Sequence, residues 1–436
     1  MRKTFHPEEN GALDQIEKIA SPLRDGKSLD TLMEAIGNSH YVLLGEASHG
    51  THEYYTWRTA ITKRLIKEKG FSFIAVEGDW PDCYRVNRYI KGYPDSGTAA
   101  SDVLHSFNRW PTWMWGNWET VALAEWLKEY NTTAEKKIGF YGLDVYSLWE
   151  SMEAIKEYLE KNDPSAVEIV KKTMDCFEPY QVREGFSYAS HAYGGFAGSC
   201  KAAVNRLLHS VRESTERFHG DNEAALSAEQ NALITVNAER YYEVMLNGGD
   251  ASWNIRDRHM NETLNRLMKF HEPNAKVIVW EHNTHIGDAR ATDMTSSGLV
   301  NVGQLVKQEH DEKGVFRVGF GSYEGSVMAS HQWGGEMQEM DLPKARFGSW
   351  EHLLHRSGAK DKLLLTKDLK DHLREKIGHR AVGVVYDPDF EAGNYVMSNI
   401  PERYEAFIFL DRTWALHPLH LRTEKSQMPE TYPWGF

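Results

Sequence analysis

Short apolar runs rich in β-branched and aromatic residues recur along the chain, and longer amphipathic stretches separate several of them. Runs of this length are typical of strands, and strands that alternate with helices form a largely parallel sheet that is covered on both faces. The sequence therefore predicts an α/β fold with a mainly parallel sheet flanked by helices. The predicted strands span residues 41–46, 71–79, 136–144, 275–283, 314–322, 380–387 and 405–411.

The stretch that follows the first predicted strand has the pattern of a crossover helix. Residues 51–69 contain no Gly or Pro, and Trp57, Ile61 and Leu65 recur every fourth residue. Arg58 then lies about two turns inside this helix. Its ordinary interpretation would be an arginine on the solvent-facing side.

The strand signal disappears between residues 147 and 272. In the stretch 254–270, the apolar residues Met260, Leu264 and Leu267 form one helical stripe of the kind that packs into a core. A large helical insertion is therefore expected. The predicted division is a first half of the α/β core at 1–146, the helical insertion at 147–272 and the second half of the core at 273–436.

Composition excludes several classes of partner. The chain has 436 residues, a formal net charge of -13 and a pI near 5.9. A nucleic-acid binder needs a basic face to neutralise phosphates, and docking on anionic lipid needs the same. We expect neither nucleic acid nor membrane as a partner, and the oligomeric state is left open.

Cysteine usage and hydropathy indicate a soluble protein of the cytoplasm. Cys83, Cys176 and Cys200 are odd in number and far apart, so neither a disulfide framework nor a paired zinc motif is expected. The N-terminus lacks the apolar stretch of a signal peptide. No segment approaches the ~18 uninterrupted apolar residues of a membrane span.

Ionisable residues follow four of the predicted strands. In open parallel sheets, ligands gather at the carboxyl ends of strands, where these side chains would share one crevice. A single carboxylate at such a place is ordinary, because it can cap the next helix. Four such ends in one sheet, two of them with histidines, favour a functional site. The ends carry Glu46 with His49, then Glu77 with Asp79 and Asp82, then Asp144, and finally Glu281, His282 and His285.

Such residues can perform hydrolysis. A histidine near neutral pH can take a proton from water, a neighbouring carboxylate can orient the ring, and an arginine can hold an oxyanion. Clustered carboxylates raise one another's pKa and can leave an acid available at neutral pH. Spacing alone names no substrate.

Motifs of rival chemistries are missing from the sequence. There is no P-loop, no GxGxxG after a strand, no GxSxG and no HExxH. A metal site remains possible by residue type, because Glu46 and His49 could share an ion with His282 and His285.

Five motifs resemble the erythromycin esterase-like family. They are GEASHGTHEYYTWR at 45–58, AVEGDW at 75–80, FYGLDVYS at 140–147, RDRHM at 256–260 and VWEHNTHIGDAR at 279–290. The resemblance runs over nearly the whole chain in the right order. It implies an α/β core with a helical elaboration and a deep cleft. Some relatives are labelled as succinoglycan biosynthesis proteins, a label that says nothing of chemistry.

The resemblance also implies roles for individual residues. Family members that open macrolide lactones use a histidine to activate water without a metal. His49 matches this general base, and Glu46 matches the carboxylate beside it. The further matching active-site groups are Arg58, Glu77, His282 and His285. Asp144 and Arg256 also match, in positions where they could serve as structural support.

Three hypotheses follow. The first is a hydrolase that cleaves a small-molecule ester or lactone by histidine-activated water, with no cofactor. The second is a metal-dependent hydrolase that uses the same histidines and carboxylates, since distant relatives with similar positions are metal-dependent peptidases. The third is a non-catalytic or biosynthetic protein of surface polysaccharide assembly.

Overall fold

The structure is a computed structural model that describes residues 7–193, 199–218, 220–246, 248–358, 360–369 and 375–420. Its centre is one large sheet with the strand order β1-β8-β11-β6-β2-β5-β3-β4, and β7 pairs with β6. The five pairings from β11 to β4 are parallel, and β1, β8 and β7 join by antiparallel pairings. The predicted fold class is therefore confirmed. The strands are β1 (Ser21–Pro22), β2 (Tyr41–Leu44), β3 (Phe73–Val76), β4 (Gly139–Gly142), β5 (Val277–Trp280), β6 (Val315–Ala329), β7 (Gln338–Leu342), β8 (Lys362–Leu365) and β11 (Ala406–Thr413).

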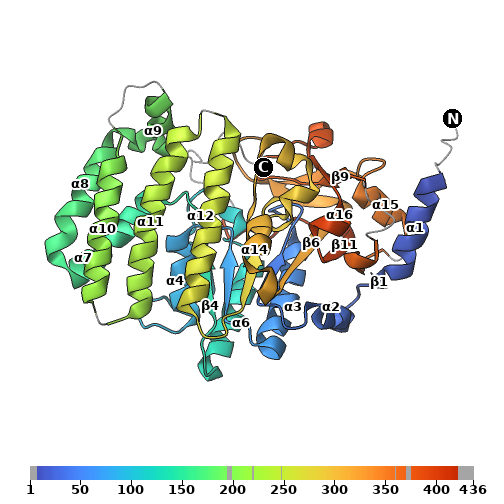
Figure 1. Ribbon diagram of the computed structural model, residues 1–436, viewed down its shortest axis with the longest axis horizontal. Coiled ribbons are helices and arrows are strands. Elements are labelled where there is room, and N and C mark those ends of the chain that lie inside the picture. The colour runs from blue at the N-terminus through green and yellow to red at the C-terminus, as the bar shows by residue number, and fades with distance from the viewer. Residues whose placement is uncertain are drawn as a thin grey trace.

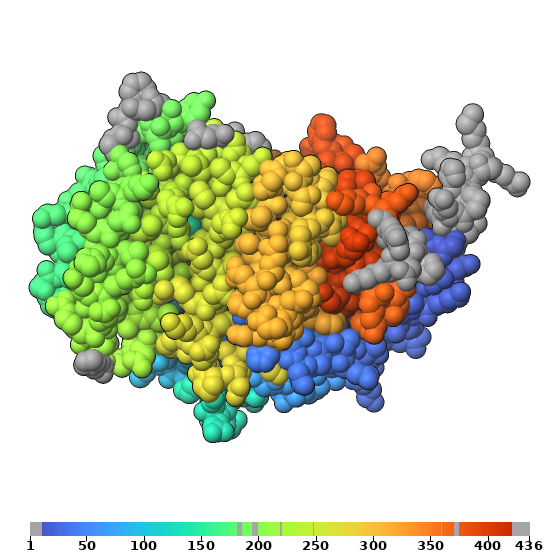
Figure 2. All heavy atoms as spheres, in the orientation of Figure 1, coloured from blue at the N-terminus to red at the C-terminus, as the bar shows by residue number. Residues whose placement is uncertain are grey.

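Helices cover both faces of this sheet (Figure 1). Alternate residues of β2 point to opposite faces, so Val42 and Leu44 pack in one core while Tyr41 and Leu43 pack in the other. The first core is covered by α3 (His52–Lys69), α4 (Trp80–Ile90) and α6 (Trp118–Thr133). The second is covered by α12 (Gly249–Phe270), α14 (Val302–His310) and α15 (Trp350–Arg356), of which α12 and α14 fill the centre of the face in Figure 2.

The chain between β4 and β5 is helical in all its described regular elements. α7 (Leu148–Asn162), α8 (Val167–Phe177), α9 (Glu184–Tyr193), α10 (Lys201–Arg217) and α11 (Asn222–Val244) share a separate apolar core beside the sheet (Figure 1). α12 follows them and turns the stripe of Met260, Leu264 and Leu267 toward the sheet. The division of the chain at residues 146 and 272 stays a prediction.

Further α-helices complete the fold. None of the helices in the described part of the chain is long and apolar enough to cross a membrane. The remaining α-helices are α1 (Pro7–Ile19), α2 (Asp30–Ile36), α5 (Ala100–Leu104), α13 (Asn283–Ile286) and α16 (Ile400–Arg403).

One predicted strand is wrong. Residues 380–387 are not a strand of the central sheet: β9 (Ile377–Arg380) pairs with β10 (Tyr395–Ser398) in a small separate sheet. The rest of the run makes only isolated bridges, in which Val382 pairs with Ser48 and Val385 with Ser330. Its apolar side chains are buried because the segment crosses the end of the sheet, and burial of that kind gives the same composition as a strand.

A single disulfide forms, although the sequence predicted no disulfide framework. Cys176 and Cys200 are bonded, with their Cα atoms 6.0 Å apart, and Cys83 is a buried free thiol. The bond joins the end of α8 to the start of α10. The two cysteines are separated by 24 positions in sequence, and only the way α9 turns back between them brings them together.

Candidate active site

The turn between β2 and α3 carries the first candidate pair and is tightly held. A Cβ atom at Gly45 would lie 2.1 Å from Oδ1 of Asn283, and one at Gly50 would lie 1.8 Å from the carbonyl oxygen of Met328. Only glycine permits approaches this close. The backbone on both sides of His49 is therefore fixed by its neighbours.

Glu46, His49 and Arg58 form a buried hydrogen-bonded chain. His49 Nδ1 lies 2.9 Å from Glu46 Oε1, and Arg58 Nη2 donates to Glu46 Oε2 at 2.6 Å. A carboxylate only accepts, so His49 carries its proton on Nδ1 and leaves Nε2 free to accept another. Burial opposes the charged ring, but Glu77 and the hydrogen bond to Glu46 outweigh it and raise the pKa of His49 above its ordinary value.

Arg58 contacts Glu46 from the protein interior. Its side chain is fully buried, and its guanidinium packs over the rings of Tyr55 and Trp280, at 4.4 and 4.6 Å from their centres. Its place on α3 agrees with the sequence, but the ordinary interpretation of a solvent-facing arginine does not hold, since Arg58 faces the sheet. Arg58 contacts Glu46 and does not line the pocket described below.

Arg256 is the centre of a second buried network. It donates from Nε and Nη2 to Asp144 at 2.9 and 2.7 Å, and from Nη2 to Glu77 at 2.7 Å. Its Nη1 lies 2.9 Å from Nε2 of His285. Because arginine only donates, His285 accepts here and carries its own proton on Nδ1, which lies 2.9 Å from Asp257 Oδ1.

Glu77 belongs to both networks. Burial would raise the pKa of Glu77, but the imidazole and guanidinium groups of His285, Arg256 and His49 outweigh burial and hold it well below its usual range. The backbone amide of His282 donates to its Oε2 at 2.8 Å. Glu77 is thus a permanent negative charge beside His49.

His282 lies next to His49, with 4.9 Å between the ring centres. Its Nδ1 accepts from the backbone amide of Thr284, so the proton is on Nε2. Burial and the neighbouring His49 lower the pKa of His282 well below its ordinary value. The neighbour of His49 is therefore a neutral ring.

A pocket opens at this end of the sheet. Among the predicted site residues, His49 and Glu77 line it, together with Asp144 and Arg256. Glu46, Arg58, His282 and His285 are buried behind this lining. The remaining wall is largely apolar and aromatic, and includes Phe107, Trp110, Met114, Trp115, Tyr146 and Trp333.

Asp79 is a pocket residue whose role the sequence did not reveal. It lies at the start of α4, where it makes no capping hydrogen bond, and its Oδ2 lies 2.8 Å from Nε of Arg109. Burial, opposed by Arg109 and assisted by Asp144, raises the pKa of Asp79 to about 8. The only sequence signal was its place after β3, because Arg109 comes from a loop without a periodic pattern.

Most of the chain matches one known protein family. The model of the erythromycin esterase family matches residues 66–413. The chain belongs to the erythromycin esterase family. A curated relative, the erythromycin esterase type II of Escherichia coli, is 22% identical over 395 residues, which are 82% of this chain and 88% of the relative. Membership supports a hydrolase of the esterase family for this chain.

Solved structures agree in fold. The crystal structure of a succinoglycan biosynthesis protein aligns with a TM-score of 0.75 at 20% identity, covering 95% of this chain and 100% of that one. A mutant of the erythromycin esterase EreC in its open conformation aligns with a TM-score of 0.66 at 16% identity, covering 90% and 95%. At these identities the likeness concerns the fold.

Several of the candidate metal ligands already contact other side chains. Both oxygens of Glu46 are engaged by His49 and Arg58, and both ring nitrogens of His285 are engaged by Asp257 and Arg256. The metal alternative with Glu46, His49, His282 and His285 would require these contacts to be broken.

Proposed function

We propose that this chain is a hydrolase that cleaves an ester or lactone by direct attack of a water molecule that His49 activates, without a metal or another cofactor. The observation that carries the proposal is the chain of hydrogen bonds from Arg58 through Glu46 to His49, which ends in an aromatic pocket. Membership of the erythromycin esterase family supports the same reaction class.

His49 is the general base. Its Nε2 takes a proton from water while the water oxygen forms a bond to the carbonyl carbon of the substrate. The imidazolium that results is stabilised by Glu46 at Nδ1 and by the charge of Glu77. Arg58 is a positioning residue, because it fixes the carboxylate of Glu46.

Arg256 stabilises the oxyanion. A guanidinium has five N–H donors, and the contacts to Asp144, Glu77 and His285 use one on Nε, two on Nη2 and one on Nη1. The second N–H of Nη1 is left for the substrate oxygen on which negative charge develops. His285 is a positioning residue in this scheme, since it fixes Arg256 and is itself fixed by Asp257.

Asp79 supplies the proton for the leaving group. A carboxyl group with a pKa of about 8 is mostly protonated at neutral pH. When the carbon–oxygen bond breaks, the departing alkoxide takes this proton and leaves as an alcohol. The proton gained by His49 then replaces it through solvent, so one water is consumed for each bond cleaved.

The pocket wall favours an apolar group next to the scissile bond. Its aromatic side chains offer stacking and contact surface, and its cavity volume is about 90 Å³, enough for several water molecules or a short acyl chain. We infer an ester or lactone with an apolar acyl or alcohol part at this position.

The test is a substrate panel with the full chain. Aryl esters of increasing acyl length, simple lactones and macrolide lactones are incubated with the protein, with and without EDTA, and products are identified by mass spectrometry. We expect gain of one water in at least one class, at a rate that EDTA leaves unchanged. Loss of activity with EDTA would establish the metal-dependent alternative. Binding of oligosaccharides without hydrolysis of any ester would replace the proposal with the polysaccharide role.

A further inference from the structure

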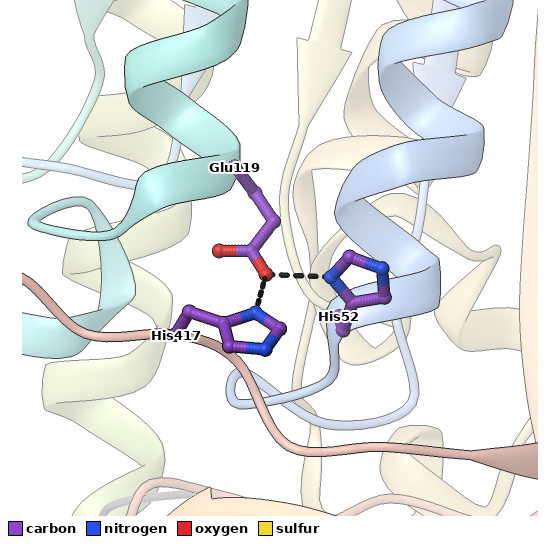
Figure 3. Close-up of side chains that lie close together, drawn as sticks. All are labelled: His52, Glu119 and His417. Carbon is purple, nitrogen blue, oxygen red and sulfur yellow. Dashed lines mark hydrogen bonds and ion pairs between the residues drawn. The ribbon is translucent and has the colours of Figure 1, made fainter.

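Two histidines and a glutamate meet outside the pocket. His52 Nδ1 donates to Glu119 Oε1 at 2.6 Å, and His417 Nδ1 donates to the same oxygen at 2.7 Å (Figure 3). The three come from the start of α3, the start of α6 and the segment after β11. Their ligand atoms all lie within 4.8 Å of one another. Within the described part of the chain, this is the one group of at least three His, Cys, Asp or Glu side chains placed to hold a metal ion in this way.

We propose that this triad is a binding site for a zinc ion, which fastens the segment after β11 to α3 and α6. Imidazole nitrogen and carboxylate oxygen are the ligands that zinc prefers, and three protein ligands leave a position for water. Ligand atoms around a tetrahedral zinc lie about 3.3 Å apart. The two nitrogen–oxygen distances, 2.6 and 2.7 Å, would therefore widen when the ion enters.

The burial and exposure of the three side chains are suited to binding an ion in place of their mutual hydrogen bonds. Glu119 is buried, with 4% of its side chain exposed, and its other carboxylate oxygen has no hydrogen-bond partner within the described residues. The imidazoles of His52 and His417 are 34% and 64% exposed, so an ion can enter from solvent.

The backbone already holds the ligands near one another. The amide of His52 donates to the carbonyl of Trp414 at 2.8 Å, and the amide of Trp118 donates to the carbonyl of His417 at 3.0 Å. A site in which the backbone fixes all three ligands loses little conformational entropy when the ion binds. The metal would therefore add to an existing contact and would not have to create it.

A zinc ion bound by the triad would also affect the catalytic pocket. Residue 52 follows the turn of His49, and residue 119 follows the loop of Trp115, whose Nε1 donates to the carbonyl of Glu77 at 2.8 Å. A bound ion would hold these two pocket-lining segments together through the segment after β11. This site is distinct from the catalytic pocket, and the proposal does not depend on the hydrolase mechanism.

Calorimetric titration of the metal-stripped full chain with zinc sulfate tests the proposal. We expect one zinc per chain with a dissociation constant in the low micromolar range or tighter, and a higher Tm with zinc. His417→Ala should weaken binding at least tenfold, whereas His209→Ala, which removes a histidine with 78% of its side chain exposed on α10, should leave it unchanged. Magnesium should not compete, since it binds oxygen ligands.

Two results would overturn the proposal. One is zinc binding of His417→Ala equal to that of the parent chain. The other is loss of the zinc site in a His49 variant and not in the His417 variant, which would place the ion in the catalytic pocket. If His417→Ala fails to fold, X-ray absorption of the zinc-loaded parent chain decides. Two nitrogens at about 2.0–2.1 Å and a carboxylate oxygen support the site, and oxygen ligands alone exclude it.

Discussion

Glu77 and Glu46 together raise the basicity of His49. Burial lowers the affinity of the ring for a proton, and Glu77 and Glu46 together raise its pKa above the ordinary value. We therefore expect kcat/KM to rise with pH through a pKa above 6.5, the unperturbed value that applies to this ring. Glu46→Gln removes one charge, so this limb should move to lower pH, and kcat should fall by at least ~10-fold. Glu213→Gln, on an exposed pair with His209, is the matched control. An unchanged limb in Glu46→Gln would contradict the role of Glu46.

The protonated carboxyl group of Asp79 predicts a basic limb. Because its pKa is about 8, activity should fall as pH rises through this value, and Asp79→Asn should abolish the limb together with most of the turnover.

The pH dependence of stability gives a second measurement of the pKa of Asp79. The unfolded carboxyl ionises near pH 3.9 while the folded one stays protonated to about 8, so ionisation favours the unfolded chain over that range. The free energy of unfolding should fall from pH 4 to 8 less steeply in Asp79→Asn than in the parent chain. Equal slopes would show that Asp79 ionises normally in the folded protein.

Single residues mark the limit of what the sequence could predict. The sequence singled out Glu46, His49 and Glu77 because each follows a strand, and a parallel sheet brings strand ends together; their roles stay a prediction. The sequence did not show which way the side chains turn, so Arg58 and His285, both buried behind the pocket, could not be separated from those that line it. The hydrogen bonds that distinguish them run between segments far apart in the chain.

At the scale of elements, the turn from β2 to α3 depends on the close approach at Gly50. Its carbonyl accepts from the amides of Met328 and Leu416, both at 2.9 Å, and a Cβ atom would strike the carbonyl of Met328. Gly50→Ala should destabilise the protein by about 1–3 kcal/mol or more and should also lower kcat by moving His49. Gly26→Ala is the control, because nothing lies within 4 Å of its Cβ position. Thermal unfolding and turnover of both variants measure the effect. A Gly50→Ala protein with unchanged Tm would show that the turn can relax.

The elements themselves were predictable to different degrees. The strands β2, β3, β4 and β5 are buried on both faces and read as continuous apolar runs, so the sequence revealed them. The run at 380–387 has the same composition for another reason, since it is buried across the end of the sheet. An apolar run shows that a segment is buried. Only its pairing partners show whether it is a strand of the sheet or a segment that crosses the end of the sheet.

At the scale of the whole molecule, the disulfide stabilises the helical part, and neither of its cysteines lines the pocket. Cys176 and Cys200 close a loop of 24 positions, and a loop of this length constrains the unfolded chain by about 3 kcal/mol. Replacing both with Ser should lower the Tm and leave kcat unchanged. Adding dithiothreitol should lower the Tm of the parent chain to the same value and should not affect the double variant. A double variant as stable as the oxidised parent would show that the bond contributes nothing.

The whole fold converges on His49, which stands where two buried networks meet the pocket. The most direct measurement is the turnover of His49→Asn on a substrate that the parent chain hydrolyses, with thermal unfolding measured in parallel. The proposed mechanism predicts a variant with nearly unchanged Tm whose kcat falls by ~10²–10⁴-fold, the usual contribution of a general base. A stable His49→Asn protein that keeps near-normal turnover would contradict the mechanism.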